Sequence, residues 1–302
     1  MSTIAESPRT TESPHATTGF PARFFAAAFG FTWAFWILAA LADNGLITLP
    51  VPSGLLLSVG GFGPMVAAIV LTSIASGRSG VRSLLGRALR WRVAPIWYAV
   101  VLAGPFLLQL TGMGIHVALG GQPPDLAALA GMVPSVLLQS VFILFLVATA
   151  EEFGWRGYAL PRLQARHNAL ISSLILGVVW ALWHLPLFFN PDTSYSNTPF
   201  WVWMVFLLPY AIVLTWVYNG TGGSLLMCLV LHAVVNASGS LWMAIPAYGA
   251  ADNLGVAVQV HVYLIQAAVM FIAAAAIVIA RGPLNLSREP RQIAEPATRK
   301  VN

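Results

Sequence analysis

The sequence predicts an all-α fold, a polytopic transmembrane bundle of about eight helices. Three observations predict it: an apolar composition, a series of apolar stretches long enough to cross a bilayer, and basic residues confined to alternate loops. Hydrophobic residues make up 58% of the 302 positions and charged residues 8%, against about 25% charged in an ordinary soluble domain. A soluble protein with so apolar a surface would aggregate, so lipid is the solvent that this composition favours.

Eight apolar stretches have about the length of 20 residues, or more, that a membrane-crossing helix needs. They lie at 24–42, 55–75, 95–119, 134–160, 169–189, 200–218, 223–243 and 256–280. The sequence before them is rich in Ser, Thr and Pro, and the sequence after them is polar with three prolines. We therefore predict a disordered N-terminal tail (1–22), an eight-helix membrane domain (23–281) and a disordered cytoplasmic tail (282–302).

The basic residues indicate the orientation. Lysine and arginine occur near the two ends of the chain and in alternate loops, while the loops near Asp43, Asp125, Asp192 and Asp252 contain none. This bias predicts that both termini are cytoplasmic. The arginine-rich loop between spans two and three faces anionic lipid in this arrangement, so membrane lipid is an expected partner and nucleic acid is not. Arginine far exceeds lysine, which favours a GC-rich bacterial genome and hence a bacterial cell membrane.

A few polar residues fall inside the predicted spans, where ionisable groups are energetically expensive and are functional candidates. The site candidates are Glu151, Glu152, Arg156, His184, His232 and Asn236. Glu152 and Arg156 are four residues apart and can pair on one helical face, whereas Glu151 points about 100° away from Glu152. His232 and Asn236 form a second pair of this spacing.

Depth in the membrane decides whether these groups can meet. If span four continues through Gly157 to Leu163, Glu151 lies roughly 18 Å from its cytoplasmic end, at about 1.5 Å per residue. On the same scale, His184 lies roughly 22 Å into span five and His232 roughly 14 Å into span seven. These depths overlap within the uncertainty of the span ends. We therefore expect a carboxylate and two imidazoles from three helices to converge in one cavity.

Such a cavity suits hydrolysis. A carboxylate and an imidazole that share a water molecule can deprotonate it for attack on a peptide carbonyl, so Glu151 is the predicted base and His184 its water-holding partner. His232 and Asn236 can donate hydrogen bonds to the oxyanion that develops. We favour no cofactor, but Glu151, His184 and His232 are also an acceptable zinc ligand set.

Two other functions fit the same residues. In a non-catalytic membrane immunity or scaffold protein, the polar groups would only hold helices together. In a proton-coupled transporter, Glu151 and His232 would form a relay, although transporters usually carry repeated halves and no repeat is evident here. A scaffold predicts dry, mutually bonded pairs, whereas a peptidase predicts a cavity open to the cytoplasm or laterally to lipid.

At these residues, the sequence resembles the CPBP family of intramembrane endopeptidases, which comprises CAAX proteases and bacteriocin-processing enzymes and is also called the abortive-infection family. Glu151, Glu152 and Arg156 match its Glu-Glu-x-x-x-Arg signature. His232 and Asn236 match its His-x-x-x-Asn/Asp signature. The order of the signatures along the chain agrees as well.

His184 matches the remaining signature, Phe-x-x-x-His, except that Trp180 replaces the phenylalanine. Because one aromatic ring replaces another, we expect this change to affect packing and not chemistry. The resemblance covers about residues 130–240 and implies an eight-helix intramembrane endopeptidase with Glu151 as catalytic base, acting on a membrane-associated peptide or protein. The family was long described as metal-dependent and is now usually considered a glutamic peptidase, so the resemblance implies a metal-free site.

Overall fold

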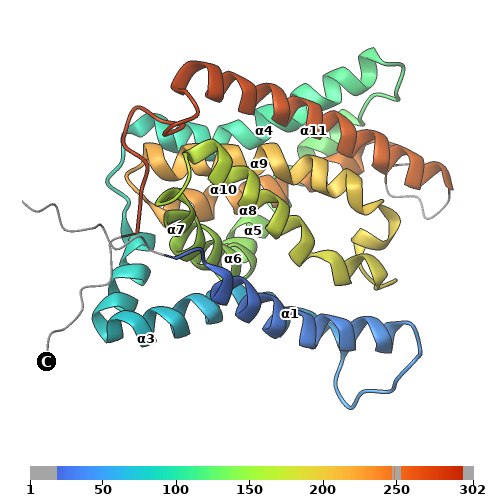
Figure 1. Ribbon diagram of the computed structural model, residues 1–302. Coiled ribbons are helices and arrows are strands. Elements are labelled where there is room, and N and C mark those ends of the chain that lie inside the picture. The colour runs from blue at the N-terminus through green and yellow to red at the C-terminus, as the bar shows by residue number, and fades with distance from the viewer. Residues whose placement is uncertain (1–18, 247, 249–252, 295–302) are drawn as a thin grey trace, which may run out of the picture.

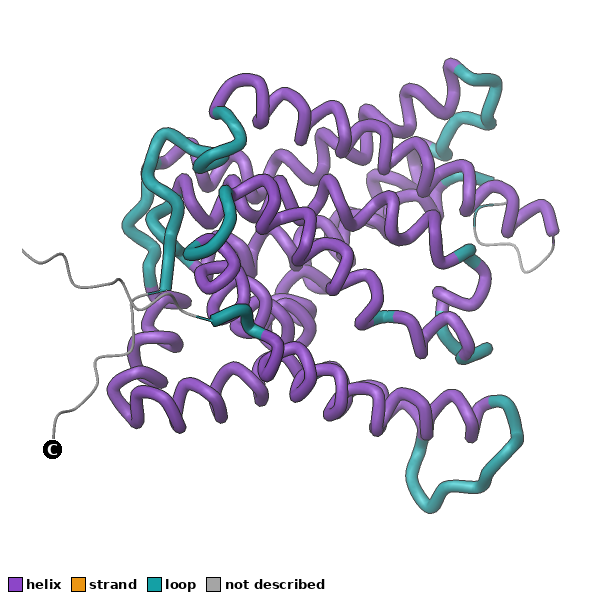
Figure 2. Tube along the Cα trace, viewed as in Figure 1, coloured by secondary structure: helices purple, strands orange, loops and turns teal. Residues whose placement is uncertain are grey.

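The computed structural model describes residues 19–246, 248 and 253–294. Within these ranges, eight helical stretches are long and apolar enough to cross a membrane, which confirms the predicted fold class and number of spans. They are Ala22–Asp43, Gly63–Leu89, Pro95–Ala118, Leu126–Gln164, Ala169–Phe189, Phe200–Gly220, Leu225–Ala244 and Gly255–Arg281. All the secondary structure of the described ranges is helical, and the long loops lie at the two ends of the bundle (Figure 2).

The α-helices pack as a bundle that surrounds the polar residues. They are α1 (Ala22–Asp43), α2 (Ser53–Gly61), α3 (Gly63–Gly86), α4 (Pro95–Ala118), α5 (Leu126–Ile143), α6 (Thr149–Gly154), α7 (Leu160–Gln164), α8 (Ala169–Trp183), α9 (Phe200–Gly220), α10 (Leu225–Ser238) and α11 (Asn253–Arg281). The start of α1 and the end of α11 lie at the same end of the bundle (Figure 1), as an even number of spans requires. α9 packs against both α8 and α11, α10 packs against α4 and α5, and α3 packs against α6.

Span four is one long helical rod that consists of α5, α6, α7 and the turns between them. It continues to Gln164, which confirms the expected extension past Gly157. The rod begins earlier than predicted, because the side chain of Asp125 caps α5 by accepting hydrogen bonds from the N–H groups of Ala127 and Ala128. Pro134, the first residue of the predicted span, therefore lies inside α5 and not at its start. Membrane helices tolerate proline at such interior positions.

Close contact between α3 and α6 holds the carboxylate-bearing segment in place. A Cβ atom added at Gly154 would lie 2.4 Å from the Cβ of Pro64 and 2.7 Å from its carbonyl oxygen. Only glycine permits this approach, since a backbone atom cannot move aside as a flexible side chain can. The contact fixes α6 against α3 at Gly154, and both glutamates lie in α6 just before this glycine.

The segment after α11 runs back over the end of the bundle. The side chains of Gln164 and Asn219 donate hydrogen bonds to each other, with N···O distances of 3.1 and 2.7 Å. Asn219 also donates to the carbonyl oxygen of Asn285 at 2.8 Å, and Gln164 donates to that of Gln292 at 2.8 Å. Two buried amides from α7 and α9 thus bind the backbone of this segment.

These contacts correct the predicted C-terminal tail. Residues 282–294 are packed on the helices, and Leu286 is fully buried, so the prediction of disorder from residue 282 is wrong for this stretch. Its polarity and prolines suggested disorder, but partners distant in the sequence satisfy its backbone. The remainder of that tail, 295–302, lies outside the described residues, as do residues 1–18 of the predicted N-terminal tail.

Candidate active site

Glu151 and Glu152 lie in α6, a short α-helical stretch between two π-helical turns. These turns, at Leu144–Ala148 and Trp155–Ala159, interrupt the regular hydrogen bonding on either side, and π-helical turns are frequent at functional sites. Both side chains are buried, with exposed fractions of 5% for Glu151 and 0% for Glu152. Because consecutive helical side chains diverge by about 100°, the two carboxylates face different partners.

Glu152 belongs to a buried ionic triad with Arg156 and His232. Its Oε1 accepts a hydrogen bond from Nη1 of Arg156 at 2.9 Å, which confirms the predicted pair. The same oxygen lies 2.8 Å from Nδ1 of His232, which comes from α10. All three side chains are excluded from solvent. Charges this deep require paired partners, and Oε1 of Glu152 has two, whereas Oε2 of Glu152 and Nε and Nη2 of Arg156 have no hydrogen-bond partner among the described residues.

Glu151 is bonded to the indole of Trp180. The Nε1 of Trp180 donates to Oε2 of Glu151 at 2.5 Å, and Nε1 of Trp155 lies 3.4 Å from the same oxygen. The guanidinium of Arg156 lies over the Trp180 ring, 4.4 Å from its centroid. Tryptophan at this position therefore makes a hydrogen bond to Glu151 in addition to its packing, and phenylalanine, which has no N–H group, could not make it.

His184 caps the C-terminal end of α8, and only one of its two ring nitrogens has a described hydrogen bond. Its Nδ1 lies 2.9 Å from the carbonyl oxygen of Trp180. Since a carbonyl can only accept, Nδ1 carries the proton, and Nε2 of the neutral ring keeps its lone pair. Trp183 and Trp203 contact the imidazole edge-on, with ring centroids 4.8 and 5.4 Å away. The aromatic rings thereby hold its orientation.

Glu151 and His184 line a common cavity of about 360 Å³. Residues of α1, α2, α5, α6 and the end of α8 form its wall. On the α5 side, Phe142 and Leu146 line the cavity and are 63% and 41% exposed. These side chains belong to a helical stretch long and apolar enough to cross a membrane, so this side of the cavity reaches the outer surface of the bundle.

The remaining predicted site residues lie elsewhere. His232 and Asn236 are not among the described residues that line this cavity. His232 is close enough to Glu151 and His184 for electrostatic interaction, but its Nδ1 is engaged by Glu152. Asn236 is exposed, one turn further along α10. The structure thus brings Glu151 and His184 together at one cavity and Glu152, Arg156 and His232 together beside it.

Tyr195 lines the same cavity, although the sequence analysis does not name it. It lies in the 3-10 turn Ser194–Asn197, between α8 and α9, with its ring centroid 5.8 Å from that of His184. Burial, with smaller contributions from Tyr263 and the carboxylate of Glu151, raises the pKa of Tyr195. Its hydroxyl therefore stays protonated and can donate. A single tyrosine in a loop, outside any motif, carries no sequence signal.

The zinc alternative lacks a third ligand at this cavity within the part of the chain that the structure describes. Within the described residues, no three His, Cys, Asp or Glu side chains are placed to hold a metal ion. Glu151 and His184 line the cavity, but the third candidate ligand, His232, does not.

Comparison with known proteins agrees with the resemblance. Residues 133–238, which include all six predicted site residues, match the family described as "Type II CAAX prenyl endopeptidase Rce1-like". The chain is also 26% identical over 230 residues to the CAAX prenyl protease 2 of Methanococcus maripaludis, an alignment that covers 72% of this chain and 82% of the relative. The family resemblance drawn from the three signatures is confirmed.

Proposed function

We propose that this protein is an intramembrane endopeptidase that hydrolyses a peptide bond of a membrane-associated protein or peptide. The observation that carries the proposal is the cavity shared by Glu151 and His184, which gives a carboxylate and an imidazole lone pair access to one space inside the membrane domain. A scaffold in which the polar residues only join helices has no need of such a space. The family match supports the same reaction class.

The proposed reaction uses one water molecule. Glu151 takes a proton from a water that also bonds to Nε2 of His184, and the water oxygen forms a bond to the carbonyl carbon of the substrate. The carbonyl oxygen becomes an oxyanion, to which the Tyr195 hydroxyl donates a hydrogen bond. As the C–N bond breaks, Glu151 returns the proton to the leaving nitrogen. The products are a carboxylic acid and an amine, and no further reactant is consumed.

The ionic triad has a positioning role in this scheme. Arg156 and His232 fix Glu152, and Arg156 stacks on the indole that donates to Glu151. The oxyanion role predicted from the sequence for His232 and Asn236 competes with the assignment of Tyr195. We favour Tyr195 because it lines the cavity.

We also propose that the arginine-rich end of the bundle, which carries both ends of the described chain, faces the cytoplasm of a bacterial cell. The basic residues at this end support that orientation. The exposed rim residues on the α5 side support lateral entry of a substrate segment from the bilayer.

Cleavage by the purified full chain tests the proposal. The substrates are a farnesylated peptide ending in a CAAX sequence, chosen because the relative is named a prenyl protease, and the same peptide without the farnesyl group. Mass spectrometry would identify products, and we expect the rate to be unchanged by a chelator. Complete inactivation by the chelator with recovery on adding zinc would contradict the metal-free mechanism. Failure of the folded protein to cleave either peptide or any protein of a solubilised membrane fraction would contradict the peptidase proposal.

Trp180→Phe is expected to lower kcat by about tenfold, as the loss of one hydrogen bond to a charged group predicts, while KM stays unchanged. The substitution keeps an aromatic ring beside Arg156 and removes only the donor to Glu151. Steady-state kinetics with a thermal unfolding control would measure both effects. A kcat equal to that of the wild type would show that the indole N–H has no part in catalysis.

Tyr195→Phe is expected to lower kcat by about 10²-fold, the usual consequence of removing one oxyanion donor. Asn236→Ala is the matched comparison, because it removes the competing donor, and we expect it to change kcat by less than about threefold, as for a group outside the cavity. The reverse order of effects would restore the oxyanion role predicted from the sequence for Asn236.

A further inference from the structure

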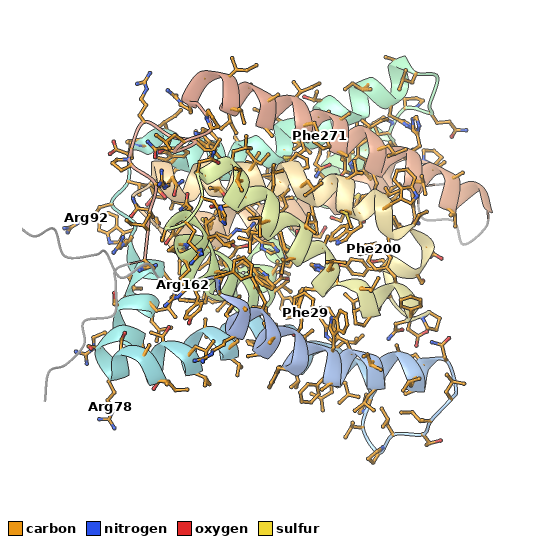
Figure 3. The ribbon with its side chains drawn as sticks, viewed as in Figure 1. Phe29, Arg78, Arg92, Arg162, Phe200 and Phe271 are labelled. Carbon is orange, nitrogen blue, oxygen red and sulfur yellow. The ribbon has the colours of Figure 1, made fainter. Side chains whose placement is uncertain are left out.

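A second cavity, of about 480 Å³, lies between α3, α7 and the segment after α11. It shares no lining residue with the cavity of Glu151 and His184. Three arginines line it, Arg87, Arg90 and Arg162, and we call it the arginine cavity. Figure 3 shows that Arg162 lies toward the same end of the bundle as Arg78 and Arg92, with Phe200 toward the other end.

The three guanidinium groups are held in place by neutral oxygens. Arg87 donates through Nη1 to the carbonyl of Gly157 and to the Tyr218 hydroxyl, both at 3.1 Å. Arg90 donates to the carbonyl of Gly222 at 2.7 Å. Arg162 donates to the carbonyl of its neighbour Tyr158 at 2.9 Å and stacks on that residue's ring. Each of these described bonds uses one nitrogen of its guanidinium, so further N–H groups remain to bind a ligand.

Nothing in the described structure neutralises these charges. No aspartate or glutamate is among the described residues that line the arginine cavity, and both described ion pairs involve Glu152 in the triad. Arg87 and Arg162 are close enough to repel each other. Arg87 and Arg162 are half-buried and Arg90 is exposed, so water screens part of their mutual repulsion, and a bound anion would relieve the rest.

The rest of the lining includes serine hydroxyls as well as apolar side chains such as Leu84 and Ile293. Ser76, Ser79 and Ser83 line the arginine cavity from α3, and the Ser79 hydroxyl donates to the carbonyl oxygen of Ser76 at 3.0 Å. Planar guanidinium groups bind phosphate through paired N–H groups, and serine hydroxyls complete such sites. We propose that the arginine cavity binds a phosphate group, carried either by the headgroup of an anionic phospholipid or by a small phosphate compound in solution.

Binding to the full-length protein in neutral detergent tests this proposal without any measurement of peptidase activity. The probes are dioctanoyl phosphatidylglycerol, dioctanoylglycerol as its phosphate-free counterpart, and inorganic phosphate, each titrated by calorimetry. We expect the phosphatidylglycerol to bind at least about tenfold more tightly than dioctanoylglycerol, as one or more charge-assisted hydrogen bonds predict. Binding of inorganic phosphate as well would assign the site to a soluble ligand, and its failure to bind would assign the site to the lipid.

Two pairs of variants locate the binding. Arg90→Gln/Arg162→Gln is expected to weaken phosphate binding by about tenfold or more. Arg82→Gln/Arg92→Gln, which removes the same charge from exposed positions outside the cavity lining, should change it by less than about twofold. If the first double variant does not fold, Ser83→Glu places a repelling carboxylate at an exposed lining position, and Ser83→Gln is its neutral counterpart of equal size. Equal effects within either pair, or no binding by the wild type, would overturn the proposal.

Discussion

Glu151→Gln is expected to reduce peptide cleavage by roughly 10²–10⁴-fold, the contribution of a positioned general base. Glutamine keeps the size of the side chain and a carbonyl oxygen that can accept the hydrogen bond from Trp180. It cannot take a proton from water. The rate should therefore fall without a matching loss of folded protein, which single-turnover cleavage and thermal unfolding would measure together.

A matched control for this variant is Ser58→Ala. Ser58 lines the same cavity, and its hydroxyl donates only to the carbonyl of Gly54 in its own helix. Its removal should leave cleavage within about twofold of the wild type, as for an exposed group without a partner in the site. Undiminished cleavage by Glu151→Gln would eliminate Glu151 as the base, and equal losses in both variants would indicate damage to the cavity instead.

Arg156→Met is expected to lower the free energy of unfolding by about 3–5 kcal/mol, because it leaves the buried charge of Glu152 with only the His232 imidazole as a partner. The side chains of Arg156 and Glu152 are both 0% exposed, so water cannot replace the lost contact. Methionine fills a similar length in the core and can still lie against Trp180. Reversible unfolding in detergent, monitored by tryptophan fluorescence, would measure the change.

The double variant Glu152→Gln/Arg156→Met separates charge from packing. With both charges removed, we expect much of the lost stability to return, because an apolar or neutral replacement of a buried pair is often nearly neutral. The introduced glutamine offers His232 an uncharged carbonyl oxygen in place of a carboxylate, so recovery should be incomplete. If Arg156→Met is as stable as the wild type, the triad does not stabilise the fold as we describe.

The variants Glu151→Gln and Arg156→Met distinguish the two adjacent glutamates. Glu151→Gln should affect catalysis and spare stability, whereas Arg156→Met acts through Glu152 and should affect stability first. The distinction follows from the contacts: Glu151 meets a cavity and two indoles, and Glu152 meets a guanidinium and an imidazole. Neighbours in the sequence therefore have different environments because a helix turns by about 100° per residue.

The sequence by itself determined the helical fold class, the number of spans and which polar residues fall inside them. Each of these depends on local information. A bilayer requires about 20 consecutive apolar residues for each helix, and any polar residue within them stands out. The pair of Glu152 and Arg156 was also predictable, since helical geometry alone places residues four apart on one face.

Only the tertiary structure decided which polar residues share a space. His232 reaches Glu152 across 80 residues of sequence, Trp180 donates to Glu151 across 29, and Tyr195 enters the cavity from a loop. The ordered segment after α11 depends in the same way on the distant amides of Gln164 and Asn219. The physical reason is that periodicity fixes directions within one helix, whereas contacts between helices depend on how whole helices rotate and pack.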